Sequence, residues 1–261
     1  MQPVPHDPSG RPQTAPRMVR FVGAGPGDPE LLTLRAARLI AEADVVIHDR
    51  LAPASIVDLA RPAAVRLAVG KTGYGPSWKQ ADINALIVEC ARRGEAVVRL
   101  KGGDPSVFGR LDEEIDALEA AGIGYEVVPG VTSACAAAAT IGRSLTRRGR
   151  NRAFRVLTGH DVDGFAEQDW RELARPGATA AVYMGARAAA FLRGRLLMHG
   201  ARADTPVTAV ERASLPGERV VATTLMDLPG ALAEAAPEGP VMILLGLAPR
   251  NAAALEFREA L

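Results

Sequence analysis

Ionisable residues follow two of the apolar runs in the first half of this sequence. Asp49 and Arg50 come directly after the run at 44–48, and Lys71 comes just after the run at 65–69. Short apolar runs bounded by turn-forming residues are typical of buried strands. An ionisable pair at the end of a buried strand is a candidate functional site. A helix cap or a surface ion pair would place Asp49 and Arg50 in the same way.

The stretch at 101–110 carries a glycine pair and an acid between a strand-like run and a helix-like run. Gly102 and Gly103 would let a ligand rest on bare backbone, and Asp104 could accept hydrogen bonds from an amine or a ribose hydroxyl. Open α/β sheets bind their ligands in such loops, at the carboxyl ends of parallel strands. A tight turn followed by a helix cap is the alternative interpretation.

The loop at 23–29 also follows an apolar run and precedes a helical pattern. A strand, a glycine-rich loop and a helix at the start of an alternating chain favour a nucleotide-type ligand. The glycines are spaced G-x-G-x-G, however, and Pro26 removes a backbone N–H that a pyrophosphate would use. A nicotinamide-dependent oxidoreductase is therefore the weaker alternative.

The order of these patterns predicts two α/β domains. In the first, strand and helix patterns alternate, which predicts a parallel sheet; its strands are expected at 18–22, 44–48, 65–69, 96–100 and 125–128. In the second, helices are fewer than strands, which favours a mixed sheet; its strands are expected at 154–157, 179–184, 206–210, 219–224 and 240–245. The expected division is a disordered tail at 1–17, an N-terminal domain at 18–130, a connecting helix and arginine-rich linker at 131–153, a C-terminal domain at 154–250 and an extension at 251–261.

The composition argues against several classes of protein. A formal net charge of +1 gives no electrostatic case for binding nucleic acid or a membrane surface. No apolar run approaches the ~20 residues of a membrane span, and the N-terminus shows no secretory signal, so we expect a cytoplasmic protein. The four histidines are scattered and the two cysteines, Cys90 and Cys135, lack metal-ligand neighbours. We therefore expect no metal site and two buried, reduced thiols.

Several linked motifs occur between about residues 19 and 246. They read VGAGPGDPELLTL (22–34), DRL (49–51), VGK (69–71), RLKGGDPSVFGR (99–110), VVPGVTSA (127–134), LTGHD (157–161), YMG (183–185) and DTPV (204–207). In this order they resemble the tetrapyrrole methylases, and in particular the uroporphyrinogen-III C-methyltransferases. The resemblance implies two α/β domains with S-adenosylmethionine in the cleft between them, a homodimer, and a stand-alone methylase. The implied reaction is C-methylation of uroporphyrinogen III to precorrin-2 through precorrin-1, for sirohaem or cobalamin.

The resemblance also assigns roles to residues. Methylating a pyrrole carbon requires proton movement, with Asp49 as the implied proton acceptor and Lys71 as the implied proton donor. The implied cofactor-binding residues are Pro26, Gly102, Gly103, Asp104, Val107, Thr132, Ser133, Met184 and Ala213. Arginines suit the eight carboxylates of the substrate, and the candidates are Arg50, Arg110, Arg147 and Arg148.

Some residues depart from the family pattern. His48, Thr72 and Ser106 stand where tyrosine, arginine and an aromatic residue are usual. Leu111, Arg147 and Ala213 stand where glycine, histidine and glycine are usual. These departures bear on the substrate pocket more than on the methyl donor. They leave two alternatives open: a methylase acting on a later corrin intermediate such as precorrin-4, and a non-catalytic tetrapyrrole-binding relative. A relative that methylates ribosomal RNA is disfavoured by the near-zero net charge.

Overall fold

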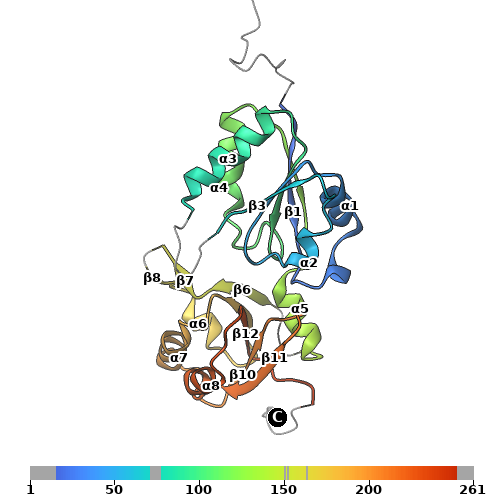
Figure 1. The fold of residues 1–261 in the computed structure, drawn as a ribbon. Coiled ribbons are helices and arrows are strands. Elements are labelled where there is room, and N and C mark those ends of the chain that lie inside the picture. The colour runs from blue at the N-terminus through green and yellow to red at the C-terminus, as the bar shows by residue number, and fades with distance from the viewer. Residues whose placement is uncertain (1–15, 71–77, 150, 152, 163, 252–261) are drawn as a thin grey trace, which may run out of the picture. The chain divides into compact units, whose positions relative to one another are not determined.

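The computed structural model describes residues 16–70, 78–149, 151, 153–162 and 164–251 (Figure 1). Contacts divide the chain into two compact units, Met1–Thr132 and Ser133–Leu261, and each large sheet lies entirely within one unit. The predicted tail at 1–17 and extension at 251–261 lie outside the described residues, except at their inner ends. Arg17 belongs to the fold, because its backbone N–H donates to the carbonyl of Ala91 at 3.2 Å.

The first unit contains a five-stranded sheet in the order β3-β2-β4-β1-β5. All of its pairings are parallel, as the alternating pattern predicts. The strands are β1 (Val19–Gly23), β2 (Val45–His48), β3 (Val65–Ala68), β4 (Val97–Lys101) and β5 (Tyr125–Val128). Because the strands are parallel, their carboxyl ends meet at one edge, where ligand sites form in such sheets.

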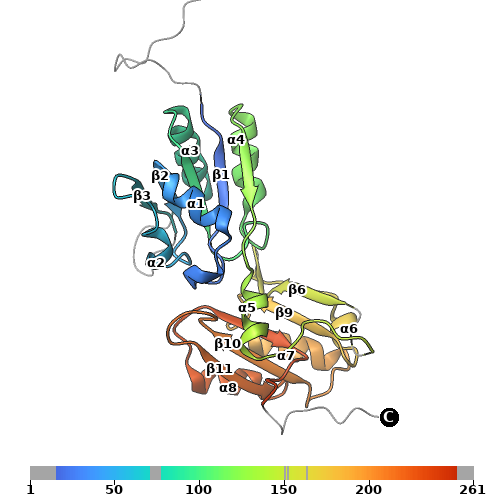
Figure 2. The same cartoon turned by 90° about the vertical axis from the view of Figure 1, so that its right-hand side faces the viewer.

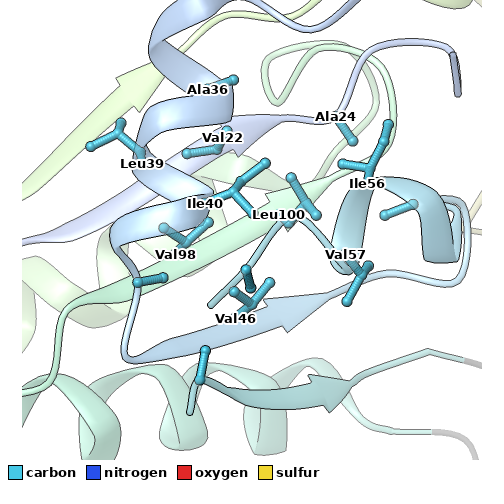
Figure 3. Packing of buried hydrophobic residues seen from close by; sticks show 14 of the residues in the cluster. Val22, Ala24, Ala36, Leu39, Ile40, Val46, Ile56, Val57, Val98 and Leu100 are labelled. Atoms are coloured by element: carbon cyan, nitrogen blue, oxygen red, sulfur yellow. The ribbon is translucent and has the colours of Figure 1, made fainter. Parts of the chain in front are cut away.

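Helices cover both faces of this sheet. They are η1 (Pro29–Leu31), α1 (Leu34–Glu42), α2 (Ala54–Val57), α3 (Gln80–Arg92) and α4 (Leu111–Ala120). On one face, α1 and α2 pack on Val46, Val98 and Leu100 (Figure 3). On the other face, α3 and α4 pack on the alternate residues, such as Val45 and Val97. The two-residue period of a strand thus decides which core each residue of β4 joins.

The second unit contains a mixed sheet in the order β11-β10-β12-β9-β6, which confirms the prediction. The pair β6–β9 is parallel and the other pairs are antiparallel. The strands are β6 (Phe154–Thr158), β9 (Thr179–Tyr183), β10 (Pro206–Glu211), β11 (Arg219–Thr224) and β12 (Val241–Leu245). A hairpin of β7 (His160–Asp161) and β8 (Gly164–Phe165) was not predicted.

The helices of the second unit also lie on both faces of their sheet. They are α5 (Ser133–Thr140), α6 (Trp170–Leu173), α7 (Ala189–Met198) and α8 (Leu228–Ala235). The last three share a core with Val182 and Val207. The helix α5 packs on the opposite face, through Ala134 and Ala137 (Figure 2). The helix predicted within a connecting segment is therefore part of the second unit.

The two cysteines differ in environment. Cys90 is buried, and burial raises the pKa of its thiol to about 11. Cys135 is exposed on α5, so the prediction of two buried thiols is wrong for this residue. The buried residues of this eight-residue helix are Ala134, Ala136, Ala137 and Ala138, and they leave the side that carries Cys135 uncovered. Among the described residues, no helix combines the length and apolar character needed to cross a membrane.

Candidate active site

Three loops of the first unit meet at glycines, at the carboxyl ends of the neighbouring strands β4, β1 and β5. A Cβ atom added at Gly130 would lie 2.3 Å from the carbonyl oxygen of Gly103. One added at Gly23 would lie 2.6 Å from the backbone nitrogen of Gly130. Because no side chain fits between these backbones, we call Gly23, Gly103 and Gly130 the glycine junction. The junction brings the three loops together as one backbone surface.

Two backbone hydrogen bonds join the loops after β1 and β4. The N–H of Gly103 donates to the carbonyl of Gly25 at 2.7 Å, and the N–H of Gly25 donates to the carbonyl of Gly103 at 3.1 Å. This bridge places Pro26, the residue after Gly25, beside the Gly102–Gly103 pair. Three of the predicted cofactor-binding residues are therefore neighbours, although 76 positions separate Pro26 from Gly102 in the sequence.

The carboxylate of Asp104 fastens the same junction. Its Oδ2 accepts from the N–H of Gly130 at 3.0 Å and its Oδ1 accepts from the N–H of Ser106 at 2.8 Å. The N–H of Val107 donates to the backbone carbonyl of Asp104 at 3.1 Å. Asp104 thus has a structural role in joining the loops after β4 and β5, which lead to Val107 and to Thr132.

Asp49 lies at the end of β2, beside the loop after β4. Its backbone N–H donates to the carbonyl of Leu100 at 3.3 Å. A Cβ atom added at Gly102 would lie 2.7 Å from the Cβ of Leu51, so the loops after β2 and β4 are in close contact. The side chain of Asp49 is 31% exposed, which leaves it accessible to a ligand. The strand order therefore brings the predicted proton acceptor next to the predicted cofactor loop.

A buried arginine binds the Asp49 side chain. Nη2 of Arg99 donates to Oδ1 of Asp49 at 2.6 Å. The Arg99 side chain is only 2% exposed, and it lies on the α3–α4 face of β4. A charge-assisted hydrogen bond of this length fixes the position of a carboxylate more firmly than a bond between neutral groups.

Arg99 is part of a buried cluster of charges with Lys101 and Glu114, which are 2% and 1% exposed. Glu114, on α4, accepts at Oε1 from Nε and Nη2 of Arg99, at 3.2 and 3.1 Å. Its Oε2 accepts from Nζ of Lys101 at 2.9 Å. Gln80, on α3, adds a hydrogen bond to Oε1 at 3.2 Å. Buried charges are retained only when they are paired in this way.

The charges of this cluster act on one another. Burial lowers the pKa of Lys101 below its ordinary value, and the positive charge of Arg99 lowers it further. The negative charges of Glu114 and Asp49 raise it and partly offset these effects. Asp49 is therefore electrostatically coupled to the buried cluster as well as hydrogen-bonded to it.

The predicted proton donor, Lys71, and the departure at Thr72 lie outside the described residues. Gly70, the residue before Lys71, is the last described residue after β3. The strand β3 is next to β2 in the sheet. A Cβ atom added at Gly70 would lie 3.2 Å from Cγ of Arg50. The end of β3 thus adjoins the residue that follows Asp49.

The four candidate substrate arginines are all exposed. Arg110 pairs with Glu113 through two hydrogen bonds, of 2.7 and 2.6 Å. This contact holds the pKa of Glu113 below its ordinary value. Arg50 and Arg110 belong to the first unit, whereas Arg147 and Arg148 belong to the second.

In the second unit, one hydrogen bond links the sequence neighbours of two predicted cofactor residues, Ser133 and Met184. The backbone N–H of Ala134, beside Ser133, donates to Oη of Tyr183 at 3.3 Å. Tyr183 precedes Met184, which is exposed and has a φ of 53°. The start of α5 is therefore tied to the end of β9.

Ala213 lies in the loop after β10 and is 8% exposed. Its neighbours Arg212 and Ser214 have φ values of 52° and 67°. When the residues on both sides of one position have left-handed backbone, the conformation of the loop is fixed by the surrounding structure. Ala213 is thus held in place, in the core that also contains α5.

Comparison with known proteins identifies the family. The model of the Tetrapyrrole (Corrin/Porphyrin) Methylases matches residues 18–229. The chain belongs to this family. It is 46% identical over 228 residues to a siroheme synthase of Chromobacterium violaceum, covering 87% of this chain and 48% of the relative. The chain thus spans about half the length of the curated relatives it matches.

Solved structures of tetrapyrrole methylases have the same fold. A uroporphyrin-III C-methyl transferase from Thermus thermophilus, complexed with S-adenyl homocysteine, aligns with a TM-score of 0.74 and 40% identity. The alignment covers 88% of this chain and 92% of that one. A cobalt precorrin-4 methyltransferase aligns with a TM-score of 0.79 and 29% identity, covering 88% and 94%.

The buried cluster of Arg99, Lys101 and Glu114 is the feature of this tetrapyrrole methylase that the sequence analysis missed. Arg99 and Lys101 lie within the motif at 99–110, and the sequence analysis predicted no role for them or for Glu114. A signal was present, because Arg99 and Lys101 are two positions apart in a strand whose other residues are apolar. Residues at that spacing share one face of a strand. Their partner Glu114 becomes apparent only when α4 packs against that face.

Proposed function

We propose that this chain is an S-adenosylmethionine-dependent C-methyltransferase that converts uroporphyrinogen III to precorrin-2 through precorrin-1, in sirohaem or cobalamin synthesis. The observation that carries the proposal is the position of Asp49, an ionisable residue beside a backbone surface made by three loops. The similarity to the Thermus thermophilus enzyme, solved with S-adenyl homocysteine, supports the choice of methyl donor and substrate.

The residues of the first unit suit S-adenosylmethionine. Gly102 and Gly103 present half-buried backbone without a side chain, and a Cβ atom at Gly102 would meet Leu51. Backbone groups of this kind bind the polar ends of such a molecule, its amino and carboxylate groups and its ribose hydroxyls. We assign this role to Pro26, Gly102, Gly103, Asp104, Val107 and Thr132 in the first unit, and to Ser133, Met184 and Ala213 in the second.

The proposed roles follow from what methyl transfer requires. Bound S-adenosylmethionine supplies an electrophilic methyl group, and transfer to a carbon needs alignment more than covalent help from the protein. Asp49, with one oxygen held by Arg99, accepts the proton that the methylated ring loses. Lys71 is proposed as the proton donor. Arg50, Arg110, Arg147 and Arg148 are proposed to bind substrate carboxylates.

An anaerobic incubation with S-adenosylmethionine and uroporphyrinogen III, followed by mass analysis of the oxidised tetrapyrrole, tests the proposal. A gain of two methyl groups is expected. Asp49→Asn should lower the rate by about 100-fold or more, in the range of general base catalysis. Asp116→Asn, an exposed change on α4, serves as the matched control. No methyl transfer by the wild-type protein would refute the proposed reaction.

A second candidate is a methyltransferase acting on a later corrin intermediate such as precorrin-4. The alignment with the cobalt precorrin-4 methyltransferase favours it. Tight binding of S-adenosylhomocysteine without transfer to uroporphyrinogen III would support this candidate. A non-catalytic tetrapyrrole-binding relative would instead bind tetrapyrrole without turnover of either substrate, and Asp49→Asn would change no rate.

The proposal carries two further expectations, a homodimer and a cytoplasmic location. Both come from the sequence resemblance and composition. Light scattering would test the first, because a homodimer has twice the 27.4 kDa mass of one chain.

A further inference from the structure

The donors of Arg99 are all used inside the first unit. Its guanidinium has five N–H groups. Nε donates to Glu114, the two hydrogens of Nη2 go to Glu114 and Asp49, and Nη1 donates to backbone carbonyls at 3.2 and 3.4 Å, those of Leu100 and Ile47. A guanidinium with every donor engaged and 2% exposure has a single orientation. Arg99 is therefore a rigid part of the sheet.

The cluster carries an excess of positive charge that Asp49 balances. Arg99 and Lys101 are two cations, and Glu114 provides one carboxylate between them. Asp49 is the other carboxylate bound to Arg99, and its ionised form neutralises the remaining charge. An unpaired buried charge is strongly unfavourable, so the contact between Asp49 and Arg99 helps to hold the cluster together.

The binding of Asp49 is one-sided. Arg99 holds Oδ1, whereas no described residue donates a hydrogen bond to Oδ2. The side chain is 31% exposed, and Oδ2 is the oxygen that the described hydrogen bonds leave for a ligand. An oriented carboxylate with one oxygen anchored and the other accessible is the arrangement a general base requires.

We propose that Arg99 is a positioning residue, which holds and orients Asp49 for proton transfer while Glu114 and Lys101 hold Arg99. This inference rests on the proposed function of Asp49. Arg99 is buried behind Asp49 and acts through it, without touching the substrate. Its contribution should therefore disappear when Asp49 no longer acts as a base.

A double-mutant cycle between Arg99→Lys and Asp49→Asn tests this inference. Lysine keeps the charge but cannot bind Glu114, Asp49 and the two carbonyls at once. Alone, Arg99→Lys should lower kcat by about 10- to 100-fold, as misplacement of a catalytic group does, with KM changed by less than about threefold. In the Asp49→Asn background the same change should lower kcat by less than about threefold, because the two residues act as one unit.

The matched control is Arg93→Lys, at an exposed ion pair with Glu89. It should leave kcat unchanged in both backgrounds. Equal losses from Arg99→Lys in the two backgrounds, or a change confined to KM, would overturn the inference. If Arg99→Lys does not fold, Glu114→Gln takes its place in the cycle, with Glu119→Gln on the same helix as control.

A second cycle, measured by urea unfolding without substrate, separates this inference from the proposed function. If Arg99 binds Asp49, the double variant should shift the urea midpoint by less than the sum of the two single shifts. If the urea cycle is non-additive but the protein methylates no tetrapyrrole, the proposed function is refuted and the contact between Arg99 and Asp49 is supported. An additive urea cycle in an active enzyme would refute the positioning role alone.

Discussion

Asp104 shows how one residue can serve the fold at the place where a ligand is expected. The sequence suggested an acceptor for an amine or a ribose hydroxyl. In the structure both carboxylate oxygens accept backbone N–H groups, from Ser106 and Gly130. Hydrogen bonds from backbone to a carboxylate are stronger than those between neutral groups. Loss of this carboxylate would therefore affect stability even without a cofactor.

We predict that Asp104→Ala lowers the free energy of unfolding by about 1–3 kcal/mol, because it leaves the N–H groups of Ser106 and Gly130 without their acceptor. Urea unfolding at pH 7 measures this change. Asp116→Ala, on the exposed side of α4, should change it by less than about 0.5 kcal/mol. Equal free energies of unfolding for Asp104→Ala and Asp116→Ala would contradict this prediction, because they would show that water satisfies the two N–H groups as well as the carboxylate does.

At the scale of elements, the carboxyl ends of the strands are held together by close backbone contact. Gly130 illustrates this, because a Cβ atom there would lie 2.3 Å from the oxygen of Gly103 and 2.9 Å from Cα of Gly23. These atoms belong to the end of β1 and to the loops after β4 and β5. The loops can separate only by bending the ends of β1, β4 and β5.

We predict that Gly130→Ala destabilises the protein by about 1–3 kcal/mol or more, since the methyl group overpacks the glycine junction. Gly124→Ala, at the other end of β5, meets nothing within 4 Å and should have an effect within about 0.5 kcal/mol. Urea midpoints of the two variants give the comparison. Similar midpoints would mean that the loops relax without strain.

A buried carboxylate also joins elements in the second unit. Glu211, at the end of β10, accepts from the N–H groups of Glu238 and Gly239, at 2.8 and 2.7 Å, and from Nε of Arg219 at 2.7 Å. Burial alone would raise the pKa of Glu211. The hydrogen bonds from Gly239, Arg219 and Glu238 outweigh this effect, and the net pKa is below the ordinary value of 4.5.

The sign of this shift predicts an acid-sensitive contribution to stability. A carboxylate with a lowered pKa stabilises the fold above the unfolded-state value of 4.5, and this contribution is lost as the pH falls through the lower folded-state pKa. Glu211→Gln should therefore be less stable than wild type at pH 6, with a smaller difference at pH 3. Urea midpoints of Glu211→Gln and wild type at pH 6 and pH 3 measure the two differences in stability. The exposed change Glu234→Gln is the control, and a constant difference for Glu211→Gln would contradict the prediction.

At the scale of the whole molecule, each unit contains its own sheet and its own cores. The two cores of the first unit use residues between Val19 and Val128, and the two of the second use residues between Ala134 and Leu247. A segment with a complete sheet covered on both faces has the features of an independently folding domain.

We predict that a fragment of residues 16–132 folds on its own and unfolds cooperatively in urea. A shorter fragment, 16–120, lacks β5 and the loop that Asp104 binds, so it should not show a cooperative transition. Circular dichroism during urea titration distinguishes the two. A non-cooperative transition for the longer fragment would show that the first unit needs the second.

The sequence by itself determined the class of fold, the strand order along the chain and the family. Apolar runs and glycine-rich loops are local features, so β1 to β5 and the strands of the second sheet could be predicted within a residue or two. Asp49 and the Gly102–Gly103 pair could be recognised because they immediately follow such runs. Lys71 was predicted in the same way and stays a prediction.

Only the tertiary structure decided which of these residues are neighbours and what holds them. The order β3-β2-β4-β1-β5 places Asp49 beside the loop after β4, although Asp49 and Gly102 are 53 positions apart in the sequence. The contacts of Arg99 with Asp49 and Glu114 join residues 50 and 15 positions away. Local patterns carry no information on such pairings, because burial and charge balance arise only when β4 is covered by α3 and α4.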